Sequence, residues 1–591
     1  YWGGDERGND FAGPRHDFPW CVPIATQTLH AAGAAMAFKV RKENRCALAY
    51  VGDGGTSEGS FYEAINLAGA KQLPIVFMIV NNKWAISVPI EQQTAAQTLA
   101  QKAIAAGIPG IQVDGNDVIA VRDCVSKALD KARRGGGPTV IEALSYRLSD
   151  HTTADDASRY RSDDEVAQAW KVEPLIRLRK LLTSRGVLDD AKEQAMKAEY
   201  SREVDAAVQE HSEAIDGCDV RLSVRKSTAT SRRAKRDRQA LRGHGSTVAL
   251  NASTMPNATT KVTAQVATKV TMIEAIAMAQ AWELEHDPSV IVLGEDVGKS
   301  GGVFRATAGL YERFGPQRVQ DTPLAENMIA GMCVGMAAQG MKPVAEIQFM
   351  GFLYPAIDQI VNHMSRLRHR TRGRLSCPVV IRMPHGGGIH APEHHSESVE
   401  SMLAHIPGVR VVCPSSPGRA YGLLLAAIRD PDPVIFLEPA RIYRLVKQEV
   451  ADDGVALPLD TCFTLREGDD VTLVTWGAMT TDVLKAAEQL AQEGIDAEVI
   501  DLATISPIDT DTILASVAKT GRLVIVHEAA RNCGVGAEIA ALVAERGLYD
   551  LTAPIQRVTG FDTVMPLYRL ENDYIPSIAR ICDAVKLAVG G

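Results

Sequence analysis

Residues 47–84 constrain the fold of this chain most strongly, because two apolar runs of strand length flank a helix-like segment. The first run enters a glycine-rich turn at residues 52–55, and the second ends on Asn81 and Asn82. Such a unit predicts two parallel strands whose carboxyl ends form a ligand crevice. Asp53 and Asn82 would then lie at the tips of neighbouring strands.

The polar residues at these strand ends suit a phosphate and a metal ion. Glycines allow a phosphate to approach backbone N–H groups at the start of the following helix. The Asp53 carboxylate, the Asn82 amide oxygen and a nearby main-chain carbonyl are hard oxygen donors, which suit Mg²⁺ held together with a diphosphate. An ordinary turn with an aspartate cap would explain Gly-Asp-Gly alone, but the second polar strand end favours the metal site.

The Gly-Asp-Gly turn is followed by the asparagine pair, with Asn82 29 residues after Asp53. This spacing resembles the cofactor motif of thiamine diphosphate enzymes. The whole run GDGGTSEGSFYEAINLAGAKQLPIVFMIVNNKWAISVP is similar to the α subunit of the decarboxylating first component of 2-oxo acid dehydrogenase complexes, especially bacterial pyruvate dehydrogenase. The resemblance implies that Mg²⁺ is held by Asp53, Asn82 and the main-chain carbonyl of Trp84, with Gly52 and Gly54 close to the diphosphate.

Length and composition narrow the class of protein further. The chain of 591 residues is long enough for about three or four domains. Its net charge of −9 argues against nucleic acid as the main partner, and no apolar run reaches the length of a membrane span. None of the ten cysteines stands in a Cys-x-x-Cys pair, as expected in a reducing compartment. We expect a cytoplasmic location, or the mitochondrial matrix in a eukaryote.

The start of the chain carries two further expectations. It begins at Tyr1 rather than at methionine, which indicates an N-terminally truncated protein. In the resembled family, an upstream Tyr-Arg or Phe-Arg pair also holds the diphosphate, and no such pair precedes Tyr1. Residues 28–40 are rich in alanine and predict a helix packed closely on the sheet.

Residues just before this helix are cofactor candidates by resemblance, although core packing would explain most of them. Ile24 matches the bulky residue that holds the cofactor in its bent shape. Four residues match positions where some family members bind K⁺: Cys21, Pro23, Thr26 and Gln27.

A polar loop at residues 146–156 follows the predicted strand 139–145 and faces the same crevice. By itself, His151 would be interpreted as a solvated loop histidine. The Tyr-Arg-x-x-x-His-Thr pattern resembles the α-subunit loop that borders the cofactor and admits the lipoyl substrate, which makes Arg147 and His151 site candidates. Thr152 occupies the place of the serine phosphorylated in animal members.

The composition changes abruptly after the helical pattern of residues 163–213. Residues 221–242 carry nine basic side chains and one acidic one, and a stretch rich in Ser, Thr, Ala and Asn follows. We predict an α-subunit-like domain over 1–216 and a flexible linker over 217–268, with a basic arm that binds nucleic acid or an acidic partner as the alternative.

A second α/β pattern begins at Lys269, and its runs GEDVGKSGGVFRAT and DTPLAEN are very similar to the β subunit of the same enzymes. A glutamate entering a helix could be merely a carboxylate that the helix dipole favours. The resemblance makes Glu326 the group that binds the aminopyrimidine ring of the cofactor. Leu324, Gln348 and Phe352 match residues lining that ring, and Glu295 matches a buried acid near the path between paired sites.

Residues 383–397 contain four histidines. A Zn²⁺ site is one interpretation, but the spacing fits no common zinc pattern, and the glycines indicate a loop that contacts a ligand. By similarity, His395 faces the reacting carbon, His394 and His390 are secondary candidates, and His385 is structural.

The resemblance covers nearly the whole chain apart from the linker. It implies an α/β fold: two doubly wound parallel-sheet domains that bind thiamine diphosphate, the second over 269–450, and a transketolase-like domain over 451–591. The last domain would form subunit contacts and dock the acyltransferase core, and no catalytic residue is expected from it. The chain is thus interpreted as a fusion of two subunits, expected to form a homodimer.

The expected activity is oxidative decarboxylation of a 2-oxo acid, with pyruvate first, and acyl transfer to lipoamide of the acyltransferase. Thiamine diphosphate and Mg²⁺ are the expected cofactors, and K⁺ is a further candidate. Glu326, His395 and His151 would be catalytic. The alternatives are a branched-chain 2-oxo acid dehydrogenase, an acetoin dehydrogenase, a transketolase, or a scaffold without activity.

Overall fold

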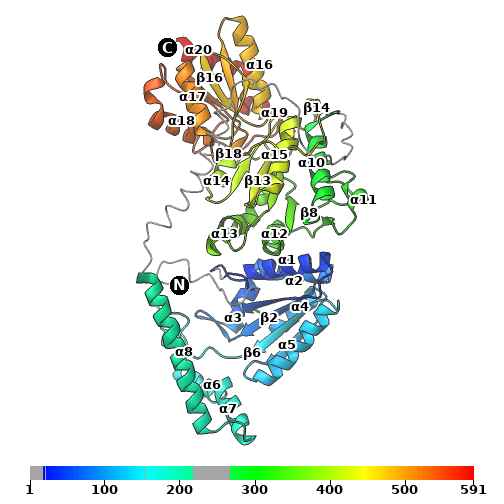
Figure 1. Ribbon diagram of the computed structural model, residues 1–591, viewed down its shortest axis with the longest axis vertical. Coiled ribbons are helices and arrows are strands. Elements are labelled where there is room, and N and C mark those ends of the chain that lie inside the picture. Colours follow the sequence, from blue (N-terminus) through cyan, green and yellow to red (C-terminus); the bar gives the residue numbers. More distant parts are fainter. Residues whose placement is uncertain (1–16, 20–21, 154, 217–266, 591) are drawn as a thin grey trace, which may run out of the picture. The chain divides into compact units, whose positions relative to one another are not determined.

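The computed structural model describes residues 17–19, 22–153, 155–216 and 267–590. The chain divides into two compact units, one made of Tyr1–Val166 with Gln265–Gly591 and the other of Ala167–Ala264 (Figure 1). Most of the expected linker and the K⁺ candidate Cys21 lie outside the described residues. Strand β7 (Thr268–Val270) begins at the last residue of that expected linker.

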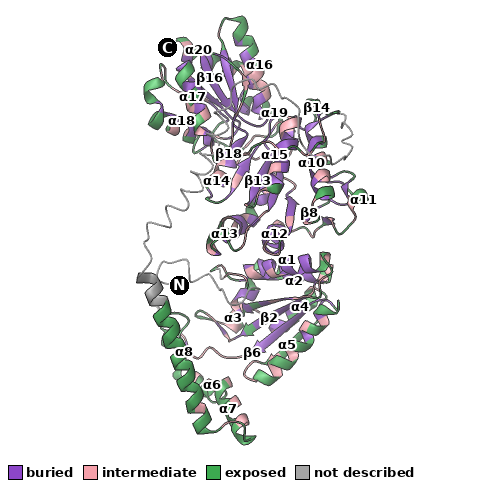
Figure 2. Ribbon diagram, viewed as in Figure 1, coloured by how far each residue is buried: buried purple, intermediate pink, exposed green. Residues whose placement is uncertain are grey.

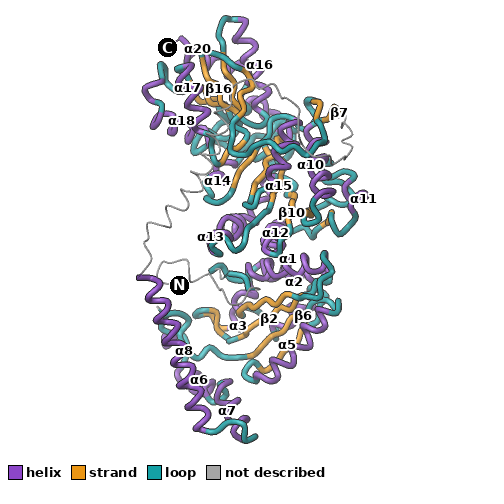
Figure 3. The backbone as a smooth tube through the Cα atoms, viewed as in Figure 1, coloured by secondary structure: helices purple, strands orange, loops and turns teal. Residues whose placement is uncertain are grey.

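The first sheet has four parallel strands in the order β1-β2-β6-β5. They span Ala47–Gly52, Ile75–Asn81, Thr139–Leu144 and Gly110–Asp114, respectively. Side chains alternate across the strands. Phe77 and Ile79 pack into the core shared with α1 (Thr26–Val40) and α2 (Gly59–Lys71), whereas Val76 and Met78 face α5 (Val118–Arg133). Helices therefore cover both faces, as a doubly wound sheet requires (Figure 3).

The register of this sheet brings the polar strand ends to one edge. Gly52 of β1 pairs with Val80 of β2, and Asn81 of β2 pairs with Leu144 of β6. The prediction that Asp53 and Asn82 follow neighbouring parallel strands is confirmed by this pairing.

The second sheet has seven strands in the order β18-β12-β13-β11-β10-β8-β9, all parallel apart from β18. They span Thr504–Ser506, Arg410–Val412, Val434–Pro439, Val380–His385, Lys342–Glu346, Val290–Gly294 and Val319–Asp321. Helices α10 (Met272–His286) and α15 (Pro417–Arg429) pack on this sheet in one core, and α12 (Glu326–Ala338) packs in another. The predicted fold class of a second parallel-sheet α/β domain is therefore confirmed.

The third sheet has the order β15-β17-β16-β19-β20, with β15 antiparallel to its neighbour. Its strands span Phe463–Arg466, Ala497–Asp501, Val471–Thr475, Leu523–Val526 and Gln556–Val558. Helices α16 (Met479–Gln492), α17 (Thr510–Thr520), α18 (Val535–Arg546), α19 (Tyr568–Tyr574) and α20 (Ile578–Gly590) belong to the same part of the chain. Because β18 comes from this part of the chain yet pairs with β12, the second and third domains are joined through a shared sheet.

Helices α1 and α12 join the first half of the chain to the second. A Cβ atom at Gly33 would lie 2.0 Å from the Met332 carbonyl oxygen, and one at Gly335 would lie 1.9 Å from the His30 carbonyl oxygen. The two backbones can approach this closely only because these residues are glycines. The small-residue pattern in both helices therefore serves this contact, which lies among buried residues (Figure 2).

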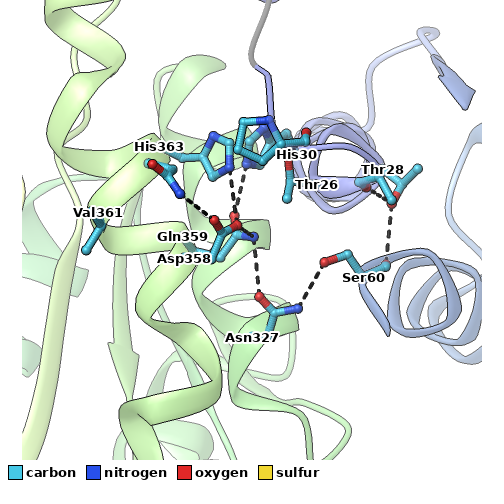
Figure 4. A network of polar contacts seen from close by, with 12 residues as sticks. Thr26, Thr28, His30, Ser60, Asn327, Asp358, Gln359, Val361 and His363 are labelled. Carbon is cyan, nitrogen blue, oxygen red and sulfur yellow. Dashed lines mark hydrogen bonds and ion pairs between the residues drawn. The ribbon is translucent and has the colours of Figure 1, made fainter. Parts of the chain in front are cut away.

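A polar network crosses the same contact (Figure 4). His30 Nε2 lies 3.0 Å from Gln359 Oε1, and the Gln359 amide donates to Asn327 Oδ1 at 3.3 Å. Asn327 in turn donates to Ser60 Oγ of α2 at 3.2 Å. Burial lowers the pKa of His30 to about 4, so this histidine is neutral at pH 7 and can be accommodated in the core.

Helices α6 (Asp163–Trp170), α7 (Pro174–Ser184) and α8 (Asp190–Asp216) confirm the predicted helical segment, and most of their described side chains are exposed. Among the described residues, no helix has both the length and the apolar character needed to cross a membrane. All eight cysteines in the described ranges are free thiols.

Candidate functional site

Asp53 lies in the turn between β1 and the short helix η2 (Gly54–Ser57). The residue is 2% exposed, and its Oδ2 atom has no hydrogen-bond partner among the residues that the structure describes. Burial raises the pKa of this carboxyl group. A buried carboxylate oxygen without a partner is unfavourable in the free protein and would be satisfied by a bound cation.

The other two expected metal donors come just after β2, the parallel neighbour of the strand that leads to Asp53. The Asn82 side-chain oxygen accepts the Trp84 N–H at 3.1 Å, and the Trp84 carbonyl oxygen accepts from the Arg147 guanidinium at 3.1 Å. Each of these oxygens keeps a second lone pair. The three donors are hard oxygen groups from one edge of one sheet, and this set fits Mg²⁺.

The two glycines flanking Asp53 have different surroundings. A Cβ atom at Gly52 would meet no described residue within 4 Å, whereas one at Gly54 would lie 2.6 Å from the Ala85 Cβ. The turn is therefore open at Gly52, where an anion could approach, and is closed at Gly54 by the hairpin of β3 (Trp84–Ala85) and β4 (Val88–Pro89).

Ile24 stands at the start of α1 and is 59% exposed. Two of the K⁺ candidates beside it already make hydrogen bonds within the protein. Thr26 Oγ1 donates to the Pro23 carbonyl at 3.0 Å, and the Gln27 amide donates to the Tyr50 carbonyl at 2.8 Å.

The loop with His151 is tied to the same edge of the sheet through residues that the sequence interpretation did not single out. Asp155 accepts the His151 N–H at 2.8 Å and the Tyr160 hydroxyl at 2.5 Å. Arg147 donates to that hydroxyl at 2.6 Å. Tyr160 carried no sequence signal, because an isolated tyrosine after a polar loop has no characteristic pattern.

Three carboxylates gather where α2 meets the start of α12. Burial, with the negative charge of Glu326, raises the pKa of Glu295 to about 7. Burial also raises the pKa of Glu63, with a smaller contribution from Glu326. Asn327 donates to Glu63 Oε2 at 3.1 Å. Glu63 was missed by the sequence interpretation, although it lies inside the run that carries the α-subunit resemblance.

The residues expected to line the pyrimidine ring are not all enclosed. Leu324 is 81% exposed, and Gln348 donates to Asp296 at 3.5 Å. In the described part of the chain, no hydrogen bond or ion pair joins Asp53 to Glu326. The structure therefore groups the diphosphate candidates at one sheet edge and the pyrimidine candidates around α12.

His395 is held in a defined orientation by two aromatic rings and one carbonyl. Its ring centre lies 4.4 Å from that of Phe349 and 5.1 Å from that of Phe352. Nδ1 lies 2.8 Å from the Glu393 carbonyl oxygen. Because a carbonyl oxygen can only accept, Nδ1 carries the proton, and Nε2 is the nitrogen that can exchange one.

The other histidines of the loop each have a separate carboxylate partner. His385 is buried and pairs with Glu400 at 3.2 Å, and His390 Nδ1 lies 2.8 Å from Glu571. Within the described ranges, no group of three or more His, Cys, Asp or Glu side chains could hold a metal ion. The zinc interpretation of this loop therefore has no geometric support.

Three family models match successive parts of the chain. The dehydrogenase E1 component model matches residues 10–216, the transketolase pyrimidine-binding domain matches 268–446, and the transketolase C-terminal domain matches 461–581. Together they define the class of protein, an E1 α-like segment fused to both transketolase-type domains.

Curated relatives make the assignment more specific. The second half is 49% identical over 317 residues to the pyruvate dehydrogenase E1 component subunit β of Acholeplasma laidlawii, a match over 54% of this chain and 97% of that protein. The Bacillus subtilis counterpart is 48% identical over 318 residues, again 54% of this chain, and 98% of its own length is matched. The chain belongs to the pyruvate dehydrogenase E1 component family.

A solved split-gene transketolase, described as an inactive β4 tetramer, is 25% identical with a TM-score of 0.46, covering 55% of this chain and 99% of its own. The E1 and transketolase domains together imply thiamine diphosphate as the cofactor.

Proposed function

We propose that this chain catalyses the oxidative decarboxylation of a 2-oxo acid, pyruvate first, and transfers the acyl group to lipoamide of an acyltransferase. Mg²⁺ would anchor the diphosphate. The bound cofactor would supply the nucleophilic carbon and accept the electrons released with CO₂. The protein would bind and orient the reactants, exclude water and move protons.

The observation that supports this proposal most directly is the state of Asp53. A buried carboxylate with one oxygen unpartnered, beside two further oxygen donors at the end of a parallel sheet, has the chemistry of a Mg²⁺–diphosphate site. We assign the metal to Asp53, Asn82 and the Trp84 carbonyl. Gly52, Gly54 and Arg147 would face the diphosphate, and K⁺ remains a further candidate near Thr26.

At the other end of the cofactor, Glu326 would hydrogen-bond the pyrimidine ring, with Leu324, Gln348 and Phe352 around it and Ile24 supporting the bent shape. His395 would exchange a proton through Nε2, because its Nδ1 donates to a carbonyl. His151 would stabilise charge at the entrance used by the lipoyl group. Each role is assigned to a side chain whose chemistry suits it.

The exposed fractions of Ile24 and Leu324 support a site that is completed by a second copy of the chain. Both are apolar residues assigned to the cofactor, and they are 59% and 81% exposed. A homodimer, in which a second copy covers these residues, would explain them. The proposed assembly is tested by measuring the mass in solution with and without thiamine diphosphate, and a monomer under both conditions would contradict it.

The activity is tested with pyruvate, branched-chain 2-oxo acids, acetoin and a sugar phosphate, each with thiamine diphosphate, Mg²⁺ and an artificial electron acceptor. We expect pyruvate to be oxidised fastest. Faster oxidation of a branched-chain acid or acetoin would show that pyruvate is not the main substrate. No turnover despite cofactor binding by calorimetry would support the scaffold alternative instead. A cytoplasmic location stays a prediction.

A further inference from the structure

Two carboxylates of the last domain contact the loop that carries His395. This histidine loop comprises residues 386–398, between β11 and α14 (Glu400–Ala404). Glu528 follows β19, and Glu571 lies in α19. Glu528 is only 6% exposed and Glu571 only 1%. Because glutamate is rarely buried without partners, both side chains should be held by hydrogen bonds.

Both carboxylates are directed at the backbone of the histidine loop. Glu571 accepts the N–H groups of Gly388 at 2.5 Å and His390 at 3.2 Å, and also pairs with the His390 ring at 2.8 Å. Glu528 accepts the Gly387 N–H at 2.5 Å and the Ser398 hydroxyl at 3.0 Å. The first part of the loop and its far end are thus both held by the last domain.

The backbone of the loop adopts conformations that require such support. Gly386 and Gly388 have φ of 84° and 83°, and a Cβ atom at Gly386 would lie 2.4 Å from Glu528 Oε1. His390 and His394 also have positive φ, at 57° and 68°. Residues other than glycine adopt positive φ stably only where surrounding contacts hold the backbone.

We propose that Glu528 and Glu571 are positioning residues that fix the histidine loop and thereby hold the His395 ring against Phe349 and Phe352. This gives the last domain a part in catalysis, although no catalytic residue is expected from it. The proposal rests on the function proposed above, because the orientation of His395 affects turnover only if this histidine serves the reaction.

Carboxylates are well suited to this task. Hydrogen bonds from N–H groups to an ionised oxygen are shorter and stronger than those between neutral groups. Glu571 accepts at both of its carboxylate oxygens, whereas a glutamine has a single acceptor oxygen. Glu528 accepts both of its donors at Oε1, so a glutamine there would remove the negative charge that strengthens the two bonds. A misplacement of a reacting group by about 1 Å can lower a rate on the order of a hundredfold. Loosening the loop should therefore affect turnover more than folding.

The first measurement is hydrogen exchange of peptides covering residues 386–398 in the unliganded full chain. We compare the parent with Glu571→Gln, Glu528→Gln and the control Asp573→Asn, which changes an exposed carboxylate on the same helix. Glu571→Gln and Glu528→Gln should each accelerate exchange in the loop by roughly tenfold or more, with unchanged exchange in β11 and β19. Asp573→Asn should leave exchange unchanged.

The second measurement is the kinetics of 2-oxo acid oxidation by the same proteins with thiamine diphosphate and Mg²⁺. Both glutamate variants should lower kcat by roughly tenfold or more with little change in KM or melting temperature, whereas a purely structural role would lower the melting temperature and leave kcat per folded molecule intact. Glu571→Gln and His390→Gln should also be combined in one protein. Expressed as activation free energies, the loss of kcat in this double variant should be smaller than the sum of the losses in the two single variants.

The proposal is overturned if loop exchange is unchanged in both variants, if Asp573→Asn has the same effect, or if the loop loosens while kcat stays at the parent value. A variant that fails to fold is replaced by Glu571→Asp, which keeps the charge and is expected to fall between parent and Glu571→Gln. If the parent oxidises no 2-oxo acid, the proposed function fails, whereas the exchange data still decide whether the two carboxylates anchor the loop.

Discussion

At the proposed diphosphate end of the candidate site, Asp53 is 2% exposed, and the other proposed metal donors, Asn82 and Trp84, come just after β2, the neighbouring strand. At the pyrimidine end, Leu324 is 81% exposed, and His395 lies on a loop held by Glu528 and Glu571 of another domain. The first end is a local unit, whereas the second depends on contacts between residues far apart in the sequence. The two ends should therefore respond differently to substitution.

The largest effect is expected from Glu326→Gln, which removes the carboxylate at the start of α12. Proton transfer and polarisation by a positioned group contribute about 10²–10⁴-fold to a rate, so kcat should fall by about that factor. Binding of thiamine diphosphate, measured by calorimetry, should change little. The matched control is Glu312→Gln, also in the first turn of a helix. Turnover near the parent value would contradict the catalytic role proposed for Glu326.

Asp53→Ala tests the diphosphate end. Loss of a group that merely orients a metal ligand weakens metal binding by about 10–100-fold, so loss of the ligand itself should raise the Mg²⁺ requirement at least as much. Asp53→Asn should also leave the unliganded protein no less stable to heat, because the buried oxygen has no partner there. Asp123→Ala, on the exposed face of α5, is the control. An unchanged Mg²⁺ requirement would contradict the metal site.

Gly335→Ala tests the contact of α1 with α12 that joins the first half of the chain to the second. The new Cβ atom would lie 1.9 Å from the His30 carbonyl oxygen, so the helices must separate. Overpacking of this kind costs about 1–3 kcal/mol, which a shift of the denaturant midpoint would report. Gly590→Ala has open space around it and should have no effect. Equal midpoints for both variants would argue against a close contact of these helices.

The smallest effect is a pH dependence of stability from Glu295. Its pKa is raised to about 7 by burial and by Glu326, from an ordinary value of 4.5. Between these values the folded state binds more protons than the unfolded state, so stability falls as the pH rises towards 7. Denaturant midpoints from pH 4 to pH 8 should show this fall for the parent and a weaker one for Glu295→Gln. Parallel curves would mean that Glu295 ionises normally.

The amino-acid sequence determined the local architecture closely. The strand predicted over 139–145 spans Thr139–Leu144 in the structure, and the helix predicted over 28–40 spans Thr26–Val40, so both predictions are right to within two residues. Apolar runs and helical periodicity are local properties, so they can be recognised without a tertiary structure. The relation between Asp53 and Asn82 was predictable for the same reason, because two consecutive parallel strands bring their ends to one edge.

Only the tertiary structure decided which distant groups complete the site. Tyr160, Glu63, Glu528 and Glu571 carry no pattern of their own, and their roles arise from side chains reaching across loops and domains. The pairing of β18 with β12 of the second sheet could not be predicted either, because the sequence patterns describe each domain separately. Periodicity reports how a segment faces its own neighbours, whereas burial and hydrogen bonding of a charged group depend on the whole packed chain.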